Sequence, residues 1–289
     1  MLFNLELPGL GRLIENSLRE DVGRGDLTTL SIVSPEARAR GIIYAKETGV
    51  IAGLSVVKSV FQYLSPSMEF KSFVPDGVTV RDGTVLAEVN GSARAILTGE
   101  RLALNFLQHL SGIASKTREF VNKVKDLRVS IVDTRKTTPG LRELEKYAVR
   151  AGGGCNHRFA LYDAVLIKDN HIKMAGGITE AVGHAKKYIS PLTKIEVEVE
   201  DIQQLKVALE AGADIIMLDN MSCEMMREAV LLVDKRVLLE ASGGVNEGNV
   251  RDIAETGVDM ISVGALTHAV RSLDISLDIN EIKKRRGRN

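Results

Sequence analysis

The sequence is poor in several features, and each shortage excludes a class of protein. It has only two cysteines, Cys155 and Cys223, which are too few for the disulfide framework of a small secreted domain. It has no excess of charge, since 38 basic residues match 38 acidic ones, so no overall field attracts nucleic acid or an anionic membrane. It contains no apolar run near the ~20 residues that span a bilayer, and no charged and apolar leader follows Met1. These absences predict a cytoplasmic protein that binds neither nucleic acid nor membrane.

The chain is long enough for two domains, with 289 residues of which 44% are hydrophobic. Its first part opens with an amphipathic helix at residues 10–18 and then alternates short strand-like runs with glycine turns, interrupted by one helix near residues 56–64. This pattern predicts a mostly antiparallel α+β domain. A biotin or lipoate carrier is disfavoured because no lysine lies at a hairpin tip. A long helix is expected from Thr98 onward, with Arg101 in its first turn.

From Ile131 onward the chain becomes regular. Apolar strands alternate with helical patterns, the first of which we expect to begin at Thr138-Pro139 and to end at Gly152. Such repeated units predict a parallel sheet or barrel whose working residues lie at the carboxyl ends of the strands. The six predicted strands are IVDTRK, AVLIKDN, KIEVEVE, DIIMLDN, RVLLEASGG and DMISVGAL.

Five cations gather at two of these strand ends and after the glycines that follow the first helix. Arg135 and Lys136 end one strand, Lys168 ends the next, and His157 and Arg158 follow three glycines. A single such cation is more typical of a solvent-facing strand end. Five together favour a ligand with several carboxylates or phosphates, because these groups pair with guanidinium and ammonium side chains.

Acidic residues mark the next two strand ends. In KIEVEVE, the alternation places Glu196, Glu198 and Glu200 on one face of the strand. Acids inside a barrel need cations or a metal to offset desolvation, whereas acids on the outside are simply solvated, and both orientations remain open. If they face inward, Asp219 at the end of the following strand can complete an oxygen site for Mg²⁺.

The last two strands end in small residues, Ser242-Gly243-Gly244 and Gly264-Ala265-Leu266. Each precedes a helix, and free backbone N–H groups at such a place can hold a phosphate. The basic run at residues 283–286 is expected to be a solvated tail. A nucleophilic pair of Cys155 with His157 is disfavoured, since catalytic Cys and His are generally distant in sequence.

Taken together, these motifs resemble those of the quinolinate phosphoribosyltransferase family, also called nicotinate-nucleotide pyrophosphorylase (carboxylating). The resemblance implies an α/β protein with an N-terminal α+β open-sandwich domain and an incomplete, TIM-like parallel α/β barrel. The first would contain residues 1–110 joined by a C-terminal helix at about 271–289, and the barrel residues 111–270. It also implies a homodimer with shared active sites, and leaves a hexamer of dimers open. The motifs that carry the resemblance lie at residues 20–26, 100–105, 133–140, 152–158, 166–171, 196–200, 217–220, 241–244 and 263–268.

The resemblance also assigns roles to individual residues. The activity it implies is a type II phosphoribosyl transfer that converts quinolinate and 5-phosphoribosyl 1-pyrophosphate to nicotinate mononucleotide, pyrophosphate and CO₂ in de novo NAD biosynthesis. Lys136, Glu198 and Asp219 would be catalytic, the two acids as Mg²⁺ ligands. The quinolinate-binding residues would be Arg101, Arg135, His157, Arg158 and Lys168. The contacts to phosphoribosyl pyrophosphate would be Thr134, Lys136, Glu198, Asp219, Ser242, Gly243, Gly244, Val263, Gly264 and Ala265.

Four alternatives stay open at this point. They are a molybdenum-transport-associated relative of the same fold, a nicotinate phosphoribosyltransferase, a Schiff-base aldolase that uses Lys168, and a non-catalytic metabolite-binding protein. An assay with quinolinate, phosphoribosyl pyrophosphate and Mg²⁺ separates them from the main hypothesis.

Overall fold

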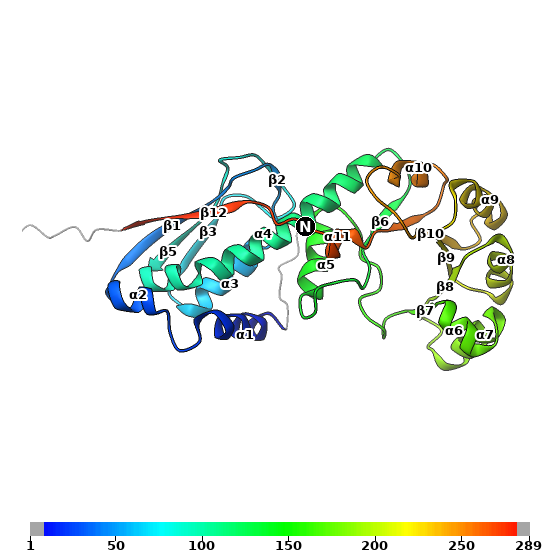
Figure 1. The fold of residues 1–289 in the computed structure, drawn as a ribbon, viewed down its shortest axis with the longest axis horizontal. Helices are drawn as coiled ribbons and strands as arrows, with labels where there is room; N and C mark the ends of the chain where they lie inside the picture. Colours follow the sequence, from blue (N-terminus) through cyan, green and yellow to red (C-terminus); the bar gives the residue numbers. More distant parts are fainter. Residues whose placement is uncertain (1–8, 282–289) are drawn as a thin grey trace, which may run out of the picture. The chain divides into compact units, whose positions relative to one another are not determined.

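The computed structural model describes residues 9–281, which divide into two compact units (Figure 1). Unit 1 contains residues 9–115, 143–152 and 270–281, and unit 2 contains residues 116–142 and 153–269. The predicted boundary near residue 110 lies close to the first of these divisions, but residues 143–152, which we assigned to the barrel, group with unit 1. Within residues 9–281, no helix is both long enough and apolar enough to cross a membrane.

Unit 1 is built on a four-stranded antiparallel sheet with the order β12-β1-β5-β3. Side chains of β1 alternate between buried and more exposed positions, as expected for a sheet with one face on a core. The strands are β1 (Arg38–Ala45), β3 (Glu69–Ser72), β5 (Val85–Ser92) and β12 (Ile275–Glu281), with β2 (Gly49–Val50) and β4 (Thr79–Val80) as a separate pair. The helices are α1 (Leu10–Val22), α2 (Leu27–Ile32), α3 (Leu54–Leu64), the first part of α4 (Ala93–Lys123) and α5 (Arg142–Ala151).

The predicted C-terminal helix was wrong where the structure can test it, because residues 275–281 form strand β12. The apolar residues Ile275, Leu277 and Ile279 alternate with polar ones, which is the period of a strand, and β12 pairs along the length of β1. The rest of that predicted helix, with the basic run at residues 283–286, lies outside the described residues.

Two predicted helix starts also need correction. Helix α4 begins at Ala93, where the Ser92 hydroxyl accepts a hydrogen bond from the Ala95 N–H at 3.3 Å, so Arg101 lies well inside the helix and not in its first turn. Helix α5 begins at Arg142 and not after Thr138, because Gly140 takes a φ of +82° that a helix cannot contain.

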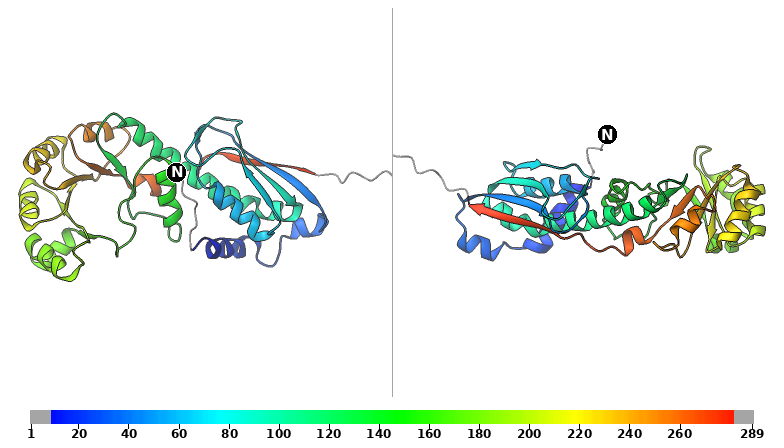
Figure 2. Two further views of the ribbon diagram at one scale, coloured as in Figure 1. Left: turned by 180° about the vertical axis from the view of Figure 1, so that it is seen from behind. Right: turned by 90° about the horizontal axis from the view of Figure 1, so that it is seen from above.

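Unit 2 is a six-stranded parallel sheet with the order β6-β11-β10-β9-β8-β7. Figure 2 draws the ribbon from two further sides. All six predicted strands are present, as β6 (Ser130–Val132), β7 (Val165–Ile167), β8 (Ile195–Val199), β9 (Ile215–Asp219), β10 (Leu238–Ser242) and β11 (Met260–Ser262). The first and last strands, β6 and β11, pair as in a barrel, but β6 and β7 lie at the two edges and do not pair with each other. The predicted incomplete parallel barrel and the antiparallel N-terminal domain are thus both confirmed.

Helices cover one face of this sheet and leave the other for polar side chains. In β8, Val197 and Val199 are fully buried on the side that α7 and α8 contact. Glu196 and Glu198 therefore face the barrel interior, which settles the orientation that the sequence left open. The helices of unit 2 are the end of α4, α6 (Asp169–Ala175), α7 (Ile178–Tyr188), α8 (Ile202–Ala211), α9 (Cys223–Val233), α10 (Val250–Ala254) and α11 (Ala265–His268).

Candidate active site

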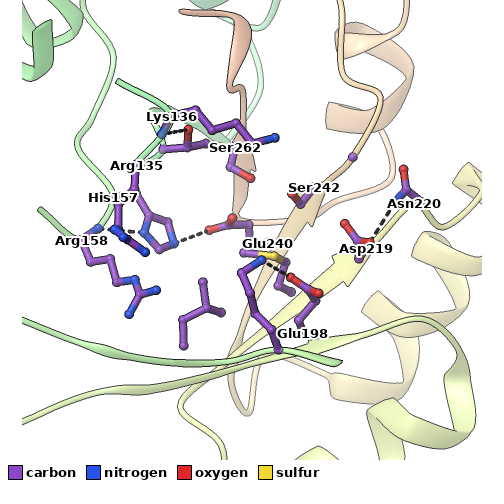
Figure 3. A pocket seen from close by; sticks show the side chains of 15 residues that line it. Arg135, Lys136, His157, Arg158, Glu198, Asp219, Asn220, Glu240, Ser242 and Ser262 are labelled. Atoms are coloured by element: carbon purple, nitrogen blue, oxygen red, sulfur yellow. Dashed lines mark hydrogen bonds and ion pairs between the residues drawn. The ribbon is translucent and has the colours of Figure 1, made fainter. Parts of the chain in front are cut away.

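A cavity of about 460 Å³ opens at the carboxyl ends of the barrel strands (Figure 3). Parallel strands bring these ends to one edge of the sheet, so residues from distant parts of the sequence meet there. The walls include most residues expected in the site: Thr134, Arg135, Lys136, His157, Arg158, Lys168, Glu198, Asp219, Ser242 and Gly243. They also include five that the sequence did not assign: Leu166, Met217, Asn220, Glu240 and Ser262.

Two guanidinium groups lie close enough to repel each other. Burial and then the neighbouring charge of Arg135 lower the pKa of the half-buried Arg158. Arg158 is held by one hydrogen bond from its Nη1 to the Ala164 carbonyl oxygen at 3.0 Å. Because like charges held together are unfavourable, this wall is suited to an anion with more than one negative group.

Hydrogen bonds to the backbone of Lys136 hold it beside Thr134 and beside helix α11, which follows the last strand. Its backbone N–H donates to the Thr134 hydroxyl at 3.0 Å, and its carbonyl oxygen accepts from the Thr267 hydroxyl at 2.7 Å. A Cβ at Gly264 would lie 3.1 Å from the Lys136 Cδ, so glycine leaves room for the lysine stem. The side chain of Lys136 stays exposed at the pocket.

The acidic wall holds Glu198 and Asp219. Glu198 Oε2 is 2.5 Å from Lys168 Nζ, and Asp219 Oδ2 accepts from Asn220 Nδ2 at 2.8 Å. Asn220 takes a φ of +53°, and a Cβ on Gly243 would come within 2.2 Å of its Oδ1. Asn220 therefore fixes Asp219 and needs a glycine beside it, a relation between two loops that a single sequence pattern cannot show.

The floor of the pocket contains a buried cluster of one histidine and two acids. His157 Nε2 lies 3.0 Å from Glu196 Oε2 and 3.3 Å from Glu240 Oε2, and the two acidic side chains are only 5% and 0% exposed. Glu240 was missed, although it interrupts the apolar run Leu238–Ala241 and so left a visible signal. Interior acids were expected to need cations or a metal, and in this cluster the Nε2 side of the His157 ring faces both carboxylates.

Two observations constrain the protons of this cluster. Burial lowers the pKa of His157, but its close contacts with Glu196 and Glu240 and their charges outweigh it and raise the pKa to about 10. The ring nitrogen Nδ1, however, accepts the Arg158 N–H at 2.8 Å, which requires a lone pair there. Both are satisfied if the ring carries its hydrogen on Nε2 and the second proton lies on an acid, since a coupled cluster titrates as one unit. Burial raises the pKa of Glu196, in line with this arrangement.

Two sets of acidic residues could hold a metal. His157, Glu196 and Glu240 have ligand atoms within 4.8 Å of one another, but an Nε2 that carries hydrogen cannot bind a metal, so the contact at Nδ1 favours a hydrogen-bonded cluster. Glu198 and Asp219 fit Mg²⁺ better, because both carboxylates line the pocket and Mg²⁺ is typically held by one or two carboxylates with substrate phosphates.

Several expected residues do not line this cavity. Gly244, Val263, Gly264 and Ala265 are absent from its walls among the described residues. Val263 is 1% exposed and its N–H donates to the Val132 carbonyl at 2.9 Å, so that group is unable to hold a phosphate. The exposed Cys155 is also outside the walls, which gives no support to a nucleophilic role.

Arg101 belongs to unit 1 and lines a different hollow, of about 410 Å³. Asp26 lies in the same wall, where its carboxylate accepts from the Thr98 hydroxyl at 3.1 Å. Arg101 is exposed, and no ion pair to it is found among residues 9–281. The neighbouring Glu100 makes no ion pair with it among these residues, although the charge of Arg101 lowers the pKa of Glu100 against the larger effect of burial, which raises it.

The fold and the pocket define an enzyme of the α/β-barrel type that binds substrates with several negative groups. Comparisons give the particular family. Residues 113–278 match the C-terminal domain of quinolinate phosphoribosyl transferase, and residues 26–111 match its N-terminal domain, so the chain belongs to the quinolinate phosphoribosyltransferase family.

Individual relatives agree with this assignment. A probable nicotinate-nucleotide pyrophosphorylase [carboxylating] of Bacillus subtilis is 47% identical, over 93% of this chain and 93% of the relative. A chloroplastic nicotinate-nucleotide pyrophosphorylase [carboxylating] of rice, Oryza sativa, is 41% identical over 94% of this chain and 78% of its own. The crystal structure of NadC from Streptococcus pyogenes superposes with a TM-score of 0.93 and 41% identity, covering 97% of this chain and all of that one.

Proposed function

We propose that this chain converts quinolinate and 5-phosphoribosyl 1-pyrophosphate to nicotinate mononucleotide, pyrophosphate and CO₂, as a step of de novo NAD biosynthesis. The observation that carries the proposal is the pairing of Arg135 with Arg158 beside the acidic wall of one pocket. Quinolinate brings two carboxylates to the first wall, and the cosubstrate brings a pyrophosphate that needs a metal at the second.

The cations position quinolinate. Arg135 and Arg158 bind its carboxylates, and the anion relieves the repulsion between the two guanidinium groups. Lys168 is engaged by Glu198 at 2.5 Å in the described structure, so its ammonium group changes partner when a substrate carboxylate or a metal enters. In this role Lys168 is a permanent cation and not a Schiff-base nucleophile.

Lys136 and the acidic wall act on the cosubstrate. Negative charge accumulates on the pyrophosphate as its bond to ribose C1 breaks, and Lys136 stabilises that charge at the pocket mouth. Mg²⁺ held by Glu198 and Asp219 would supply further neutralisation of the same charge. Once the pyridine nitrogen is bonded to ribose, its positive charge stabilises the electron pair that remains at C2 when CO₂ leaves.

The activity is tested by incubating the purified protein with quinolinate, phosphoribosyl pyrophosphate and Mg²⁺. Nicotinate mononucleotide and CO₂ are expected in equal amounts. An Arg158→Lys variant keeps the charge but loses the two-pronged donor, so it should need much more quinolinate for the same rate. Product from nicotinate in place of quinolinate, or no product at all, contradicts the proposal.

Arg101 supplies a further cation to the pocket from a second copy of the chain. It is exposed, lies in unit 1, and has no ion-pair partner among the described residues. Its guanidinium group is therefore available to pair with an external anion. A two-fold dimer can place one subunit's Arg101 at the other subunit's pocket. We expect this homodimer, which can assemble further, to work in the cytoplasm.

Subunit exchange tests the shared site. Arg101→Ala and Lys136→Ala proteins should each be nearly inactive, but a mixed dimer would contain one site free of both changes. Random exchange makes about half the dimers mixed, so roughly a quarter of all sites should recover. Exchange is verified by mass spectrometry of differently tagged chains, and verified exchange with no recovered activity places Arg101 outside the partner's site.

A further inference from the structure

Glu240 is the least explained charged residue of the pocket. Its side chain is 0% exposed, and neither oxygen accepts a hydrogen bond of normal geometry from the described residues. His157 Nε2 lies 3.3 Å from its Oε2. Burying a carboxylate with so few hydrogen bonds and ion pairs to offset its desolvation costs several kcal/mol of folding free energy. Its only visible use is to hold the imidazole ring.

That ring connects three separate parts of the barrel. Its Nε2 lies 3.0 Å from Glu196 on β8. The same nitrogen also faces Glu240 on β10, and its Nδ1 accepts the backbone N–H of Arg158 (Figure 3). Both ring nitrogens are thus used inside the protein. The ring acts as a cross-link between two strands and the backbone that carries Arg158.

The segment that carries Arg158 has little sheet structure of its own. It runs along the edge of β6, where Cys155 makes an isolated bridge to Val132, and no other strand within residues 9–281 pairs with that edge. The Asp133 carboxylate accepts from the backbone N–H of His157 at 2.9 Å and from Asn156 Nδ2 at 2.5 Å. The ring of His157 adds contacts to the interior strands β8 and β10.

We propose that Glu240, with Glu196, is a positioning residue for Arg158: the two acids fix the His157 ring, and the ring fixes the backbone from which the Arg158 guanidinium reaches quinolinate. The inference rests on the proposed function. Glu240 touches no substrate in this scheme. It sets where a substrate-binding cation lies, across an opening that a complete barrel would have filled with paired strands.

The first test is Glu240→Gln, which keeps the size of the side chain and removes its charge. We expect the KM for quinolinate to rise about tenfold or more while kcat and the KM for phosphoribosyl pyrophosphate change little, because small misplacement of a positioning group is costly. Glu228→Gln, the same change on the exposed face of α9, is the matched control and should behave as wild type. An equal rise in both KM values indicates general damage and overturns the proposal.

A double-mutant cycle tests the route of action. Arg158→Ala alone should weaken quinolinate binding, and adding Glu240→Gln should cause no further loss if the acid acts only through Arg158. Independent, multiplying losses overturn the proposal. Amide hydrogen exchange gives a structural readout, since the Arg158 N–H should exchange faster in Glu240→Gln while amides of β9 keep their protection.

Glu196→Gln provides a second route if Glu240→Gln does not fold. It should show the same selective effect on quinolinate, and wild-type behaviour of a folded Glu196→Gln protein contradicts the proposal. Failure of the proposed function is distinguishable, because the wild-type protein would then make no nicotinate mononucleotide. Calorimetric titration with quinolinate still measures binding in that case and compares the variants directly.

Discussion

Strand β8 carries two carboxylates, Glu196 and Glu198, two residues apart on its inward face. One of them makes a partly exposed contact and the other a buried one. Glu198 contacts Lys168, whose side chain is 46% exposed, at the open end of the strand. Glu196 contacts His157 in a buried cluster that also includes Glu240. The upper pair, Lys168 with Glu198, is a single contact between flexible groups, whereas the lower cluster, His157 with Glu196 and Glu240, joins three side chains.

The difference shows how one strand can supply both an exchangeable contact and a fixed one. A partly exposed ion pair contributes little to stability, so Lys168 can change partner at low cost. A buried pair that loses one member leaves an uncompensated charge, so the lower cluster must stay together. We expect the lower cluster to govern stability and the upper pair to govern turnover.

The largest effect is expected for His157→Ala. It leaves Glu196 and Glu240 buried without the ring that contacts both of them, which should lower the free energy of unfolding of unit 2 by about 3–5 kcal/mol at neutral pH. Urea denaturation followed by circular dichroism measures the loss. A loss below 1 kcal/mol would mean that the acids are stabilised in some other way.

The same cluster should make stability depend on pH. The pKa of His157 is raised from 6.5 to about 10, so the folded cluster keeps its extra proton to a higher pH than the unfolded chain does. The stabilising contribution of that proton is fully present below pH 6.5 and is lost as the pH rises toward 10. Urea midpoints between pH 6.5 and 10 should therefore decline in wild type and in Lys168→Ala. The decline should be much flatter in a Glu196→Gln, Glu240→Gln double variant, and an equal slope in all three proteins would contradict the assignment.

Lys168→Ala should show the reverse pattern of His157→Ala. We expect kcat/KM to fall about 100-fold, because the variant loses a substrate cation, while stability stays within about 1 kcal/mol. Steady-state kinetics and denaturation on one preparation give both values. Borohydride with a carbonyl substrate should trap nothing on wild-type Lys168, and a covalent adduct there would favour an aldolase mechanism instead.

The smallest effect is expected for Asp219→Ala. The KM for phosphoribosyl pyrophosphate should rise about tenfold and the requirement for Mg²⁺ should increase, since the variant lacks one of the two carboxylates that we propose as Mg²⁺ ligands. Binding of quinolinate, measured by calorimetry, should change much less. Glu198→Ala is a useful second variant, because it also removes the partner of Lys168. An equal loss of affinity for both substrates in either variant would indicate misfolding.

The sequence predicted the fold well where one pattern decides the outcome. All six barrel strands follow from apolar runs that end in polar residues. Strand β12 was missed, because the family resemblance led us to expect a helix at about residues 271–289, and the strand's partner β1 lies far away in the sequence. Pairing over such a separation leaves no local signal.

The candidate site also contains some residues that the sequence could predict and others that it could not. Arg135, Lys168 and Asp219 could be predicted because each ends an apolar strand, and strand ends meet at one edge of a parallel sheet. Glu240 lies one layer deeper in the barrel. Its role depends on contact with His157, about eighty positions earlier in the sequence, so the sequence around Glu240 does not reveal it. Asn220 acts through its fit against Gly243, a contact in space that no spacing rule predicts.

Strand β12 also sets an order of events during synthesis. The antiparallel sheet of unit 1 lacks its β12 neighbour until residues 275–281 have left the ribosome, whereas every strand of unit 2 has been made by residue 262. Until then the outer edge of β1 exposes unpaired backbone groups, which are able to pair with other chains. A nascent chain stalled before residue 275 should therefore be a target for chaperones or self-association, even though all of its barrel strands have already been made.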